Sequence, residues 1–118
     1  MESIKTKDVQ KALDRFLNRD VYLHLETTTG SYAALSGEDK MAVVAYIRNG
    51  RIKYHQGQIT GNGPYRVGLK LEDGWVYAEG LTDWELRKEQ DQLLLAGYDK
   101  DGQLAVALEL SSKPFPCN

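Results

Sequence analysis

Apolar residues near the start of the chain recur at the spacing of a helix. Between residues 7 and 18 they stand three and four positions apart, which places them on one stripe of an α-helix. The members of this stripe are Val9, Ala12, Leu13, Phe16 and Leu17. Thr6 is the expected N-cap, and Asn18 and Asp20 favour an end to the helix. The sequence therefore predicts a helix over residues 7–18.

After residue 20, short apolar runs separated by turn residues predict β-strands. Asn49-Gly50 and Asp73-Gly74 each stand between two such runs, and both dipeptides are typical of two-residue hairpin turns. A third pair of runs is joined by the longer loop 99–102. The sequence thus predicts three hairpins within a total of about seven strands.

The hairpin around Asp73-Gly74 has one apolar face and one polar face. Pairing Glu72 with Trp75 gives a register in which both strands agree on sidedness, and a slip by one residue would destroy that agreement. The apolar face carries Val67, Leu69, Leu71, Val76 and Ala78. The opposite face carries Arg66, Lys70, Glu72, Trp75, Tyr77 and Glu79. We expect the first face to be buried and the second to be available for contact.

The third hairpin has no polar face. One side carries Leu93, Leu95, Leu104, Val106 and Leu108, and the other carries Leu94, Ala96, Ala105 and Ala107. Such a ribbon is expected to be buried on both sides, with the helix or another subunit against the alanines. The predicted fold is mainly β, an antiparallel sandwich or barrel with one N-terminal α-helix. We expect a single domain over residues 1–118.

Composition narrows the class of protein. Fifteen Lys and Arg against seventeen Asp and Glu give a formal net charge of −2, which disfavours a general nucleic-acid binder. The single cysteine, Cys117, excludes an intramolecular disulfide and any multi-cysteine metal site. No apolar run is long enough for a membrane span, and the first ten residues do not resemble a signal peptide. A cytoplasmic location, without nucleic acid or membrane as partner, is expected.

The glycine-rich segment 59–66 looks like a phosphate loop but does not match one. Pro64 and Tyr65 follow Gly63 where a P-loop has lysine and serine or threonine, and a strand follows where a dinucleotide fingerprint needs a helix. We interpret the segment as a glycine-rich connection. A backbone nest for a small anion, with Arg66 adding charge, is the alternative.

Catalytic and metal-binding patterns are weak. His24 and Glu26 share one strand face and could join His55 as a metal site of the type found in β-barrel oxygenases, but this spacing is common and we expect no metal and no cofactor. There is no Gly-x-Ser-x-Gly motif, and Cys117 lies where chain ends usually fray. We assign no catalytic residue, and the sequence favours a protein without enzymatic activity. A small-molecule-binding or metal-dependent β-barrel enzyme is the alternative.

The polar face of the second hairpin is the candidate binding site. Its members are Arg66, Lys70, Trp75, Tyr77 and Glu79. Aromatic rings flanked by charge suit sugar stacking or a hot spot for a protein partner. The alternative is the solvated side of a sheet stabilised by cross-strand pairs.

Charge is segregated along the chain. Residues 41–71 carry five basic residues and no acid, whereas residues 72–101 carry nine acids and three bases. This asymmetry favours an acidic partner, for which the acidic segment of a second copy is suitable, so a homo-oligomer is expected.

Three segments resemble a known family: HLETTTGSYA, ITGNGPYRVGLKLEDGWVYAEGLT and LLLAGYDKDGQLAVALELS. They are similar to the YojF-type family, small uncharacterised proteins of bacilli that are classed as a domain of unknown function. The resemblance runs from about Val9 to Phe115 and implies a largely β fold without assigned site residues. Genes of this family often stand beside a gene for a deacetylase of the type used in bacillithiol synthesis. The resemblance thus implies a shared pathway or a physical contact with such a deacetylase. Together with the lack of a catalytic pattern and the aromatic and charged face, it favours a non-catalytic accessory or binding protein that acts beside that enzyme.

Overall fold

The computed structural model describes residues 1–27 and 45–117, which form one helix and nine strands. The elements are β1 (Glu2–Ser3), α1 (Thr6–Arg15), β2 (Val21–Thr27), β3 (Ala45–Ile52), β4 (Gln56–Thr60), β5 (Tyr65–Lys70), β6 (Trp75–Leu81), β7 (Asp83–Arg87), β8 (Gln92–Tyr98) and β9 (Leu104–Ser111). The predicted class, mainly β with one N-terminal helix, is confirmed. The strands number nine rather than about seven because the chain also forms β1, β4 and β7, whereas the two strands expected around Asn49-Gly50 are the single strand β3.

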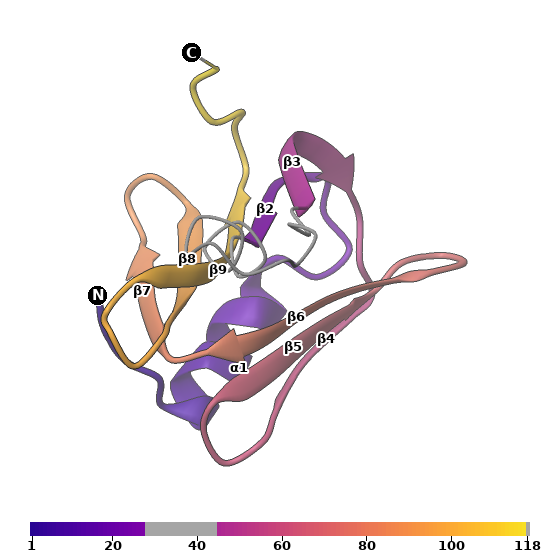
Figure 1. The fold of residues 1–118 in the computed structure, drawn as a ribbon. Coiled ribbons are helices and arrows are strands. Elements are labelled where there is room, and N and C mark those ends of the chain that lie inside the picture. The colour runs from indigo at the N-terminus through magenta and orange to yellow at the C-terminus, as the bar shows by residue number, and fades with distance from the viewer. Residues whose placement is uncertain (28–44, 118) are drawn as a thin grey trace.

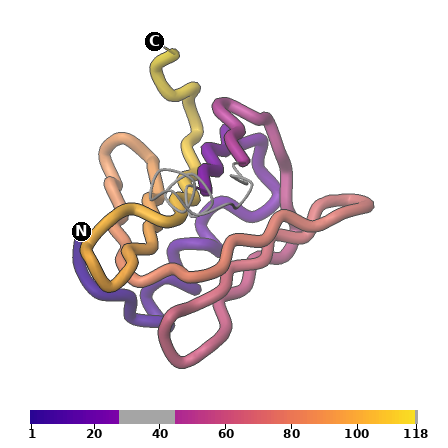
Figure 2. Tube along the Cα trace, viewed as in Figure 1, coloured from indigo at the N-terminus to yellow at the C-terminus, as the bar shows by residue number. Residues whose placement is uncertain are grey.

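The strands form two antiparallel sheets, which Figure 1 shows on either side of α1. Sheet A has six strands in the order β1-β7-β8-β9-β2-β3, and sheet B has three in the order β4-β5-β6. The chain passes from sheet B to sheet A at Thr82, whose backbone N–H donates to the carbonyl of Ala96 at 2.9 Å. The trace in Figure 2 shows the tip between β5 and β6 projecting away from the rest of the described residues.

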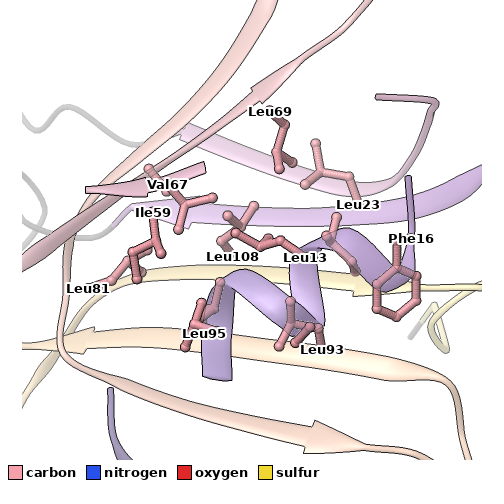
Figure 3. Close-up of a cluster of buried hydrophobic side chains, with 14 of the residues drawn as sticks. Leu13, Phe16, Leu23, Ile59, Val67, Leu69, Leu81, Leu93, Leu95 and Leu108 are labelled. Carbon is pink, nitrogen blue, oxygen red and sulfur yellow. The ribbon is translucent and has the colours of Figure 1, made fainter. Parts of the chain in front are cut away.

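The apolar face of α1 lies in the core between the two sheets. Val9, Ala12 and Leu13 are buried on the helix, as the predicted stripe requires. Figure 3 shows the leucines of β8 and β9 around the helix, with the apolar residues of sheet B nearby. The labelled core residues are Leu13, Phe16, Leu23, Ile59, Val67, Leu69, Leu81, Leu93, Leu95 and Leu108. This shared core holds the helix and both sheets together.

The ends of α1 differ in part from the prediction. The helix begins at Thr6, with Lys5 as an N-cap that makes no side-chain capping bond, so the expectation that Thr6 caps it is wrong. After the helix, Asn18 has a φ of 61°, and its N–H donates to the carbonyl of Tyr54 at 2.8 Å. The buried Tyr54 hydroxyl donates in turn to the carbonyl of Leu13 at 2.6 Å. These two hydrogen bonds fix the end of the helix against the β3–β4 link.

The second hairpin is confirmed as β5 and β6, with its turn shifted by one residue. Lys70, not Glu72, stands opposite Trp75, and the N–H of Leu71 donates to the carbonyl of Gly74 at 2.8 Å. The turn is therefore centred on Glu72-Asp73, and Gly74 lacks the positive φ of the expected turn. Because the strand pairing shifts by two positions, the predicted inner and outer faces are unchanged.

The first predicted hairpin is wrong. Asn49-Gly50 lies inside β3, where Gly50 pairs with Leu23 and Arg48 pairs with His24, so Asn49 is the extra residue of a β-bulge. Asn49 has a φ of 62°, and asparagine tolerates this conformation in a bulge as well as in a turn. Strand β3 continues through Ile52 along β2 instead of turning back. The apolar run before residue 45 lies outside the described residues.

The third hairpin is confirmed as β8 and β9. Leu95 pairs with Leu108 and Ala96 with Ala107, and all four are buried, so the ribbon is covered on both sides. The helix packs against the leucine face, because α1 shares its core cluster with Leu95 and Leu108 and not with the alanines. The expected contact of the helix with the alanine face is therefore not found. At the turn end of the hairpin, Leu104 is exposed.

Candidate functional site

The outward positions of sheet B form an array of nine residues, three from each strand. Its rows are Gln56, Lys70 and Trp75, then Gln58, Gly68 and Tyr77, then Thr60, Arg66 and Glu79. We refer to these nine residues as the sheet B grid. All five residues of the predicted binding face belong to it. Their sidedness follows from the burial of the intervening Val67, Leu69 and Ala78 in the core.

Two aromatic rings form the centre of the grid. The Trp75 and Tyr77 rings are stacked, with centroids 5.3 Å apart and planes 8° apart, and their residues are 44% and 45% exposed. Gly68 lies beneath them, since a Cβ added there would stand 2.8 Å from the ring of Tyr77. The glycine thus lets the tyrosine ring lie against the sheet, an arrangement seen where an aromatic covers a strand glycine. This role of Gly68 was not predicted, although a glycine in mid-strand between apolar residues can indicate a close approach of another group.

Cations flank both rings. The guanidinium carbon of Arg66 lies 4.0 Å from the centroid of Tyr77, and the Lys70 ammonium lies 5.8 Å from that of Trp75. The Arg66 Nε also lies 3.0 Å from a Glu79 carboxylate oxygen. Cation–π contacts of this kind hold the rings in place before any partner arrives. Two cations against one acid leave the described grid with a net positive charge.

The grid is suited to binding rather than to chemistry. It contains no nucleophile held by a neighbouring base, which covalent catalysis requires. Stacked tryptophan and tyrosine rings with an adjacent arginine are the side chains that most often dominate the binding energy of a protein interface. The arrangement can therefore offer a rigid amphipathic surface to another molecule.

The three residues considered for a metal site are not brought together. His24 Nε2 lies 3.6 Å from Glu26 Oε1, but His55 is exposed on the β3–β4 link, where its backbone N–H donates to the Lys70 carbonyl. Among the residues that the structure describes, no three His, Cys, Asp or Glu side chains are placed to hold a metal. His24 is buried, with its ring edge-on to Tyr46 at 5.3 Å, and does not lie on an open polar face as expected.

Two other sequence features have structural roles. Residues 61–64 connect β4 to β5, with positive φ at Gly61 and Gly63, so the interpretation as a glycine-rich connection fits. The side chain of Arg66 contacts Glu79 and Tyr77 of the neighbouring strand β6, so the alternative interpretation of the segment as an anion-binding nest has no support. The exposed thiol of Cys117 accepts a hydrogen bond from the side-chain amide of Asn49 at 3.1 Å.

The fold and its exposed face define a helix-bearing protein of two antiparallel sheets, with an aromatic and cationic grid on the smaller sheet. No helix in the described part of the chain is long and apolar enough to cross a lipid bilayer. Residues 3–115 match the model of a family described as "Protein of unknown function (DUF1806)", and the chain belongs to that family. The resemblance indicated by the sequence is thus confirmed.

Two comparisons give the same result. The chain is 56% identical over 115 residues to the "Uncharacterized protein YojF" of Bacillus subtilis (strain 168), and the match covers 98% of each protein. It also matches the "Crystal Structure of Bacillus subtilis YojF protein" with a TM-score of 0.81 and 51% identity, over 98% of this chain and 97% of that one. The fold is therefore similar to that of a solved relative along almost its whole length.

Proposed function

We propose that this chain is a non-catalytic, cytoplasmic accessory protein that binds a bacillithiol-type deacetylase through the sheet B grid. The observation that supports the proposal is the exposed stack of Trp75 and Tyr77, held by Arg66 and Lys70. A stack that is already ordered loses little side-chain entropy when it binds, so its buried area contributes efficiently to affinity.

The charges of the grid favour an acidic surface on the partner. Arg66 is paired with Glu79 at 3.0 Å, whereas the Lys70 ammonium lies over the Trp75 ring and forms no ion pair among the described residues. A carboxylate of the partner beside Lys70 would complete an ion pair at the rim of an aromatic contact. Complementary charge of this kind adds specificity and speeds association more than it adds affinity.

The deacetylase is chosen as partner from the gene neighbourhood that the family resemblance implies. A second copy of this chain is the competing partner, because the acidic segment 72–101 complements the basic segment 41–71. The two partners differ in what they require: a deacetylase contact needs a second protein, whereas self-association appears with the purified chain alone.

Calorimetry with a bacillithiol-type deacetylase from the same genome tests the proposal. Trp75→Ala and Tyr77→Ala are each expected to weaken binding by about thirtyfold, which corresponds to the roughly 2 kcal/mol of an interface hot spot. Tyr98→Ala is the matched control, because Tyr98 is 42% exposed but lies on sheet A. Its affinity should equal that of the parent protein.

Turnover of the deacetylase with and without the chain shows whether the contact matters. No binding and no change in turnover would contradict the accessory role. Light scattering of the purified chain separates the competing partner: a concentration-dependent oligomer that Trp75→Ala dissociates would assign the grid to self-association instead.

A further inference from the structure

A cleft of about 510 Å³ lies between helix α1 and strand β7, away from the sheet B grid. It is lined by Asp8, Lys11, Ala12, Arg15, Trp84, Leu86 and Lys88. The first four share one helix face, since they are three, four and seven positions apart, and Trp84 and Leu86 share one strand face. The volume is within the range of sites that bind small organic molecules.

The floor of the cleft is apolar. Ala12 is buried, and Trp84 and Leu86 are partly buried and pack against the core. The indole Nε1 of Trp84 is buried without a hydrogen-bond partner among the described residues. A buried donor without a partner is energetically unfavourable, and the surface that Trp84 and Leu86 offer to a ligand is mainly apolar.

The rim of the cleft has a charge balance that matches one negative charge. Arg15 is already paired with Asp91, with its Nε 3.0 Å from the carboxylate. Lys11 and Lys88 are exposed and form no ion pair within the described residues, and Asp8 is the single acid of the lining. Two free ammonium groups against one carboxylate leave a net charge of about +1. A monoanion fits this balance better than a doubly charged phosphate.

The cleft also has room beyond its own volume. A neighbouring cavity of about 500 Å³ shares Trp84, Leu86 and Lys88 and extends toward Met1 and Glu2 along β7. Strand β1 pairs only with Asp83 and Trp84 among the residues of β7, which leaves the outer edge of Glu85–Arg87 unpaired by β1. An elongated apolar group can therefore lie along Trp84 and Leu86 and continue past them.

We infer that the α1–β7 cleft is a binding site for a small amphipathic carboxylate. Its apolar body lies on Trp84 and Leu86, and its carboxylate group is held between the ammonium groups of Lys11 and Lys88. Burying the apolar body removes its surface from water and so favours binding, and the lysines select the sign of the charge. The site uses none of the residues of the sheet B grid and does not depend on the accessory role.

Titration of the full chain with octanoate tests the site. In a ¹⁵N-labelled Trp75→Phe variant the only indole N–H signal is that of Trp84, because the sequence has two tryptophans. We expect octanoate to shift this signal saturably, and octylammonium, with the same chain length and opposite charge, to bind at least about tenfold more weakly. The comparison needs no deacetylase, so its outcome is separate from that of the proposed function.

A charge variant completes the test. The double variant Lys11→Gln, Lys88→Gln is expected to weaken octanoate binding about tenfold or more, whereas Lys7→Gln, on the same helix but outside the cleft lining, should bind as the parent does. Absence of a saturable shift of the Trp84 signal would overturn the inference. Equal binding of octanoate and octylammonium by the parent protein would also overturn the inference, and this comparison needs no lysine variant. An unchanged octanoate affinity in the folded double variant would overturn it as well.

Discussion

Replacing Gly97 with alanine tests the joint between the two sheets. Gly97 of β8 lies against the backbone of Gly80 at the end of β6, where Gly80 has a φ of 83°. A Cβ at position 97 would overlap the carbonyl oxygen of Gly80 and would stand 2.7 Å from Cγ1 of Val106 and 2.8 Å from the carbonyl carbon of Gly80. Real Cβ atoms do not approach other atoms so closely, so one of the strands has to move.

The magnitude follows from what must move. Overpacking by a methyl group costs about 1–3 kcal/mol when side chains can adjust. Here the atoms in the way belong mainly to backbone at the junction of β6 and β7, whose N–H at Thr82 is bonded to Ala96. Relief therefore requires separating hydrogen-bonded strands. We expect a loss of about 3 kcal/mol or more from a total of about 5–15 kcal/mol for a domain of this size.

Urea unfolding followed by tryptophan fluorescence measures the loss. With a slope of about 1–3 kcal/mol per molar, Gly97→Ala should lower the midpoint by at least about 1 M. Gly74→Ala is the matched control, because a Cβ there meets no atom within 4 Å and its φ is not positive. Its stability should stay within about 0.5 kcal/mol of the parent. A Gly97→Ala midpoint equal to that of Gly74→Ala would refute the close approach of the sheets.

Three further predictions concern single side chains. Burial, and after it the Asp14 carboxylate, raises the pKa of Tyr54 well above its ordinary 10.0. The stability that this group contributes is therefore present below about pH 10 and falls as the pH rises further. Tyr54→Phe should lower the free energy of unfolding by about 1 kcal/mol at pH 7, and urea titrations should show a smaller loss of stability at alkaline pH. Burial acts to raise the pKa of Asp91, but hydrogen bonds from Arg19 and Arg15 outweigh it and hold that pKa below 3.8. Asparagine tolerates the positive φ of this position, and Asp91→Asn should lower the free energy of unfolding by about 1 kcal/mol at pH 7. The difference in stability from the parent should become smaller below about pH 4, as the carboxylate of the parent protonates. An equal difference at both pH values would contradict this prediction. Asn49→Gly keeps the bulge conformation but loses both side-chain hydrogen bonds to Phe115, so amide exchange over residues 113–117 should accelerate with little change in Tm.

The face on which each side chain of β5 and β6 lies was predictable from the sequence, whereas the positions of the turns were not. Alternation along residues 65–79 assigns each side chain to a face, and a shift of two in the pairing leaves those faces intact. Asn49-Gly50 was wrongly predicted to be a hairpin turn because hairpin turns and β-bulges both favour residues that tolerate a positive φ. Only the pairing of β3 with β2 distinguishes the two structures.

The candidate sites were predictable to different extents. The grid residues on β5 and β6 follow from the alternation of apolar and polar residues. The contribution of β4 and the packing of the Tyr77 ring on Gly68 depend on how the strands pair. The α1–β7 cleft was not predictable, because Lys11 and Trp84 are far apart in sequence and meet only through the core. A pattern of single elements carries no information about which elements become neighbours.

The position of β9 in sheet A has a consequence for synthesis of the protein. Strand β2 is made early, yet one of its neighbours is β9, the last strand of the described chain to be made. Until β9 emerges from the ribosome, the β9-facing edge of β2 and the leucines of β8 lack their native cover. Unpaired strand edges and uncovered apolar surface favour aggregation, so we expect the incomplete chain to aggregate more readily than one whose neighbouring strands follow one another in sequence.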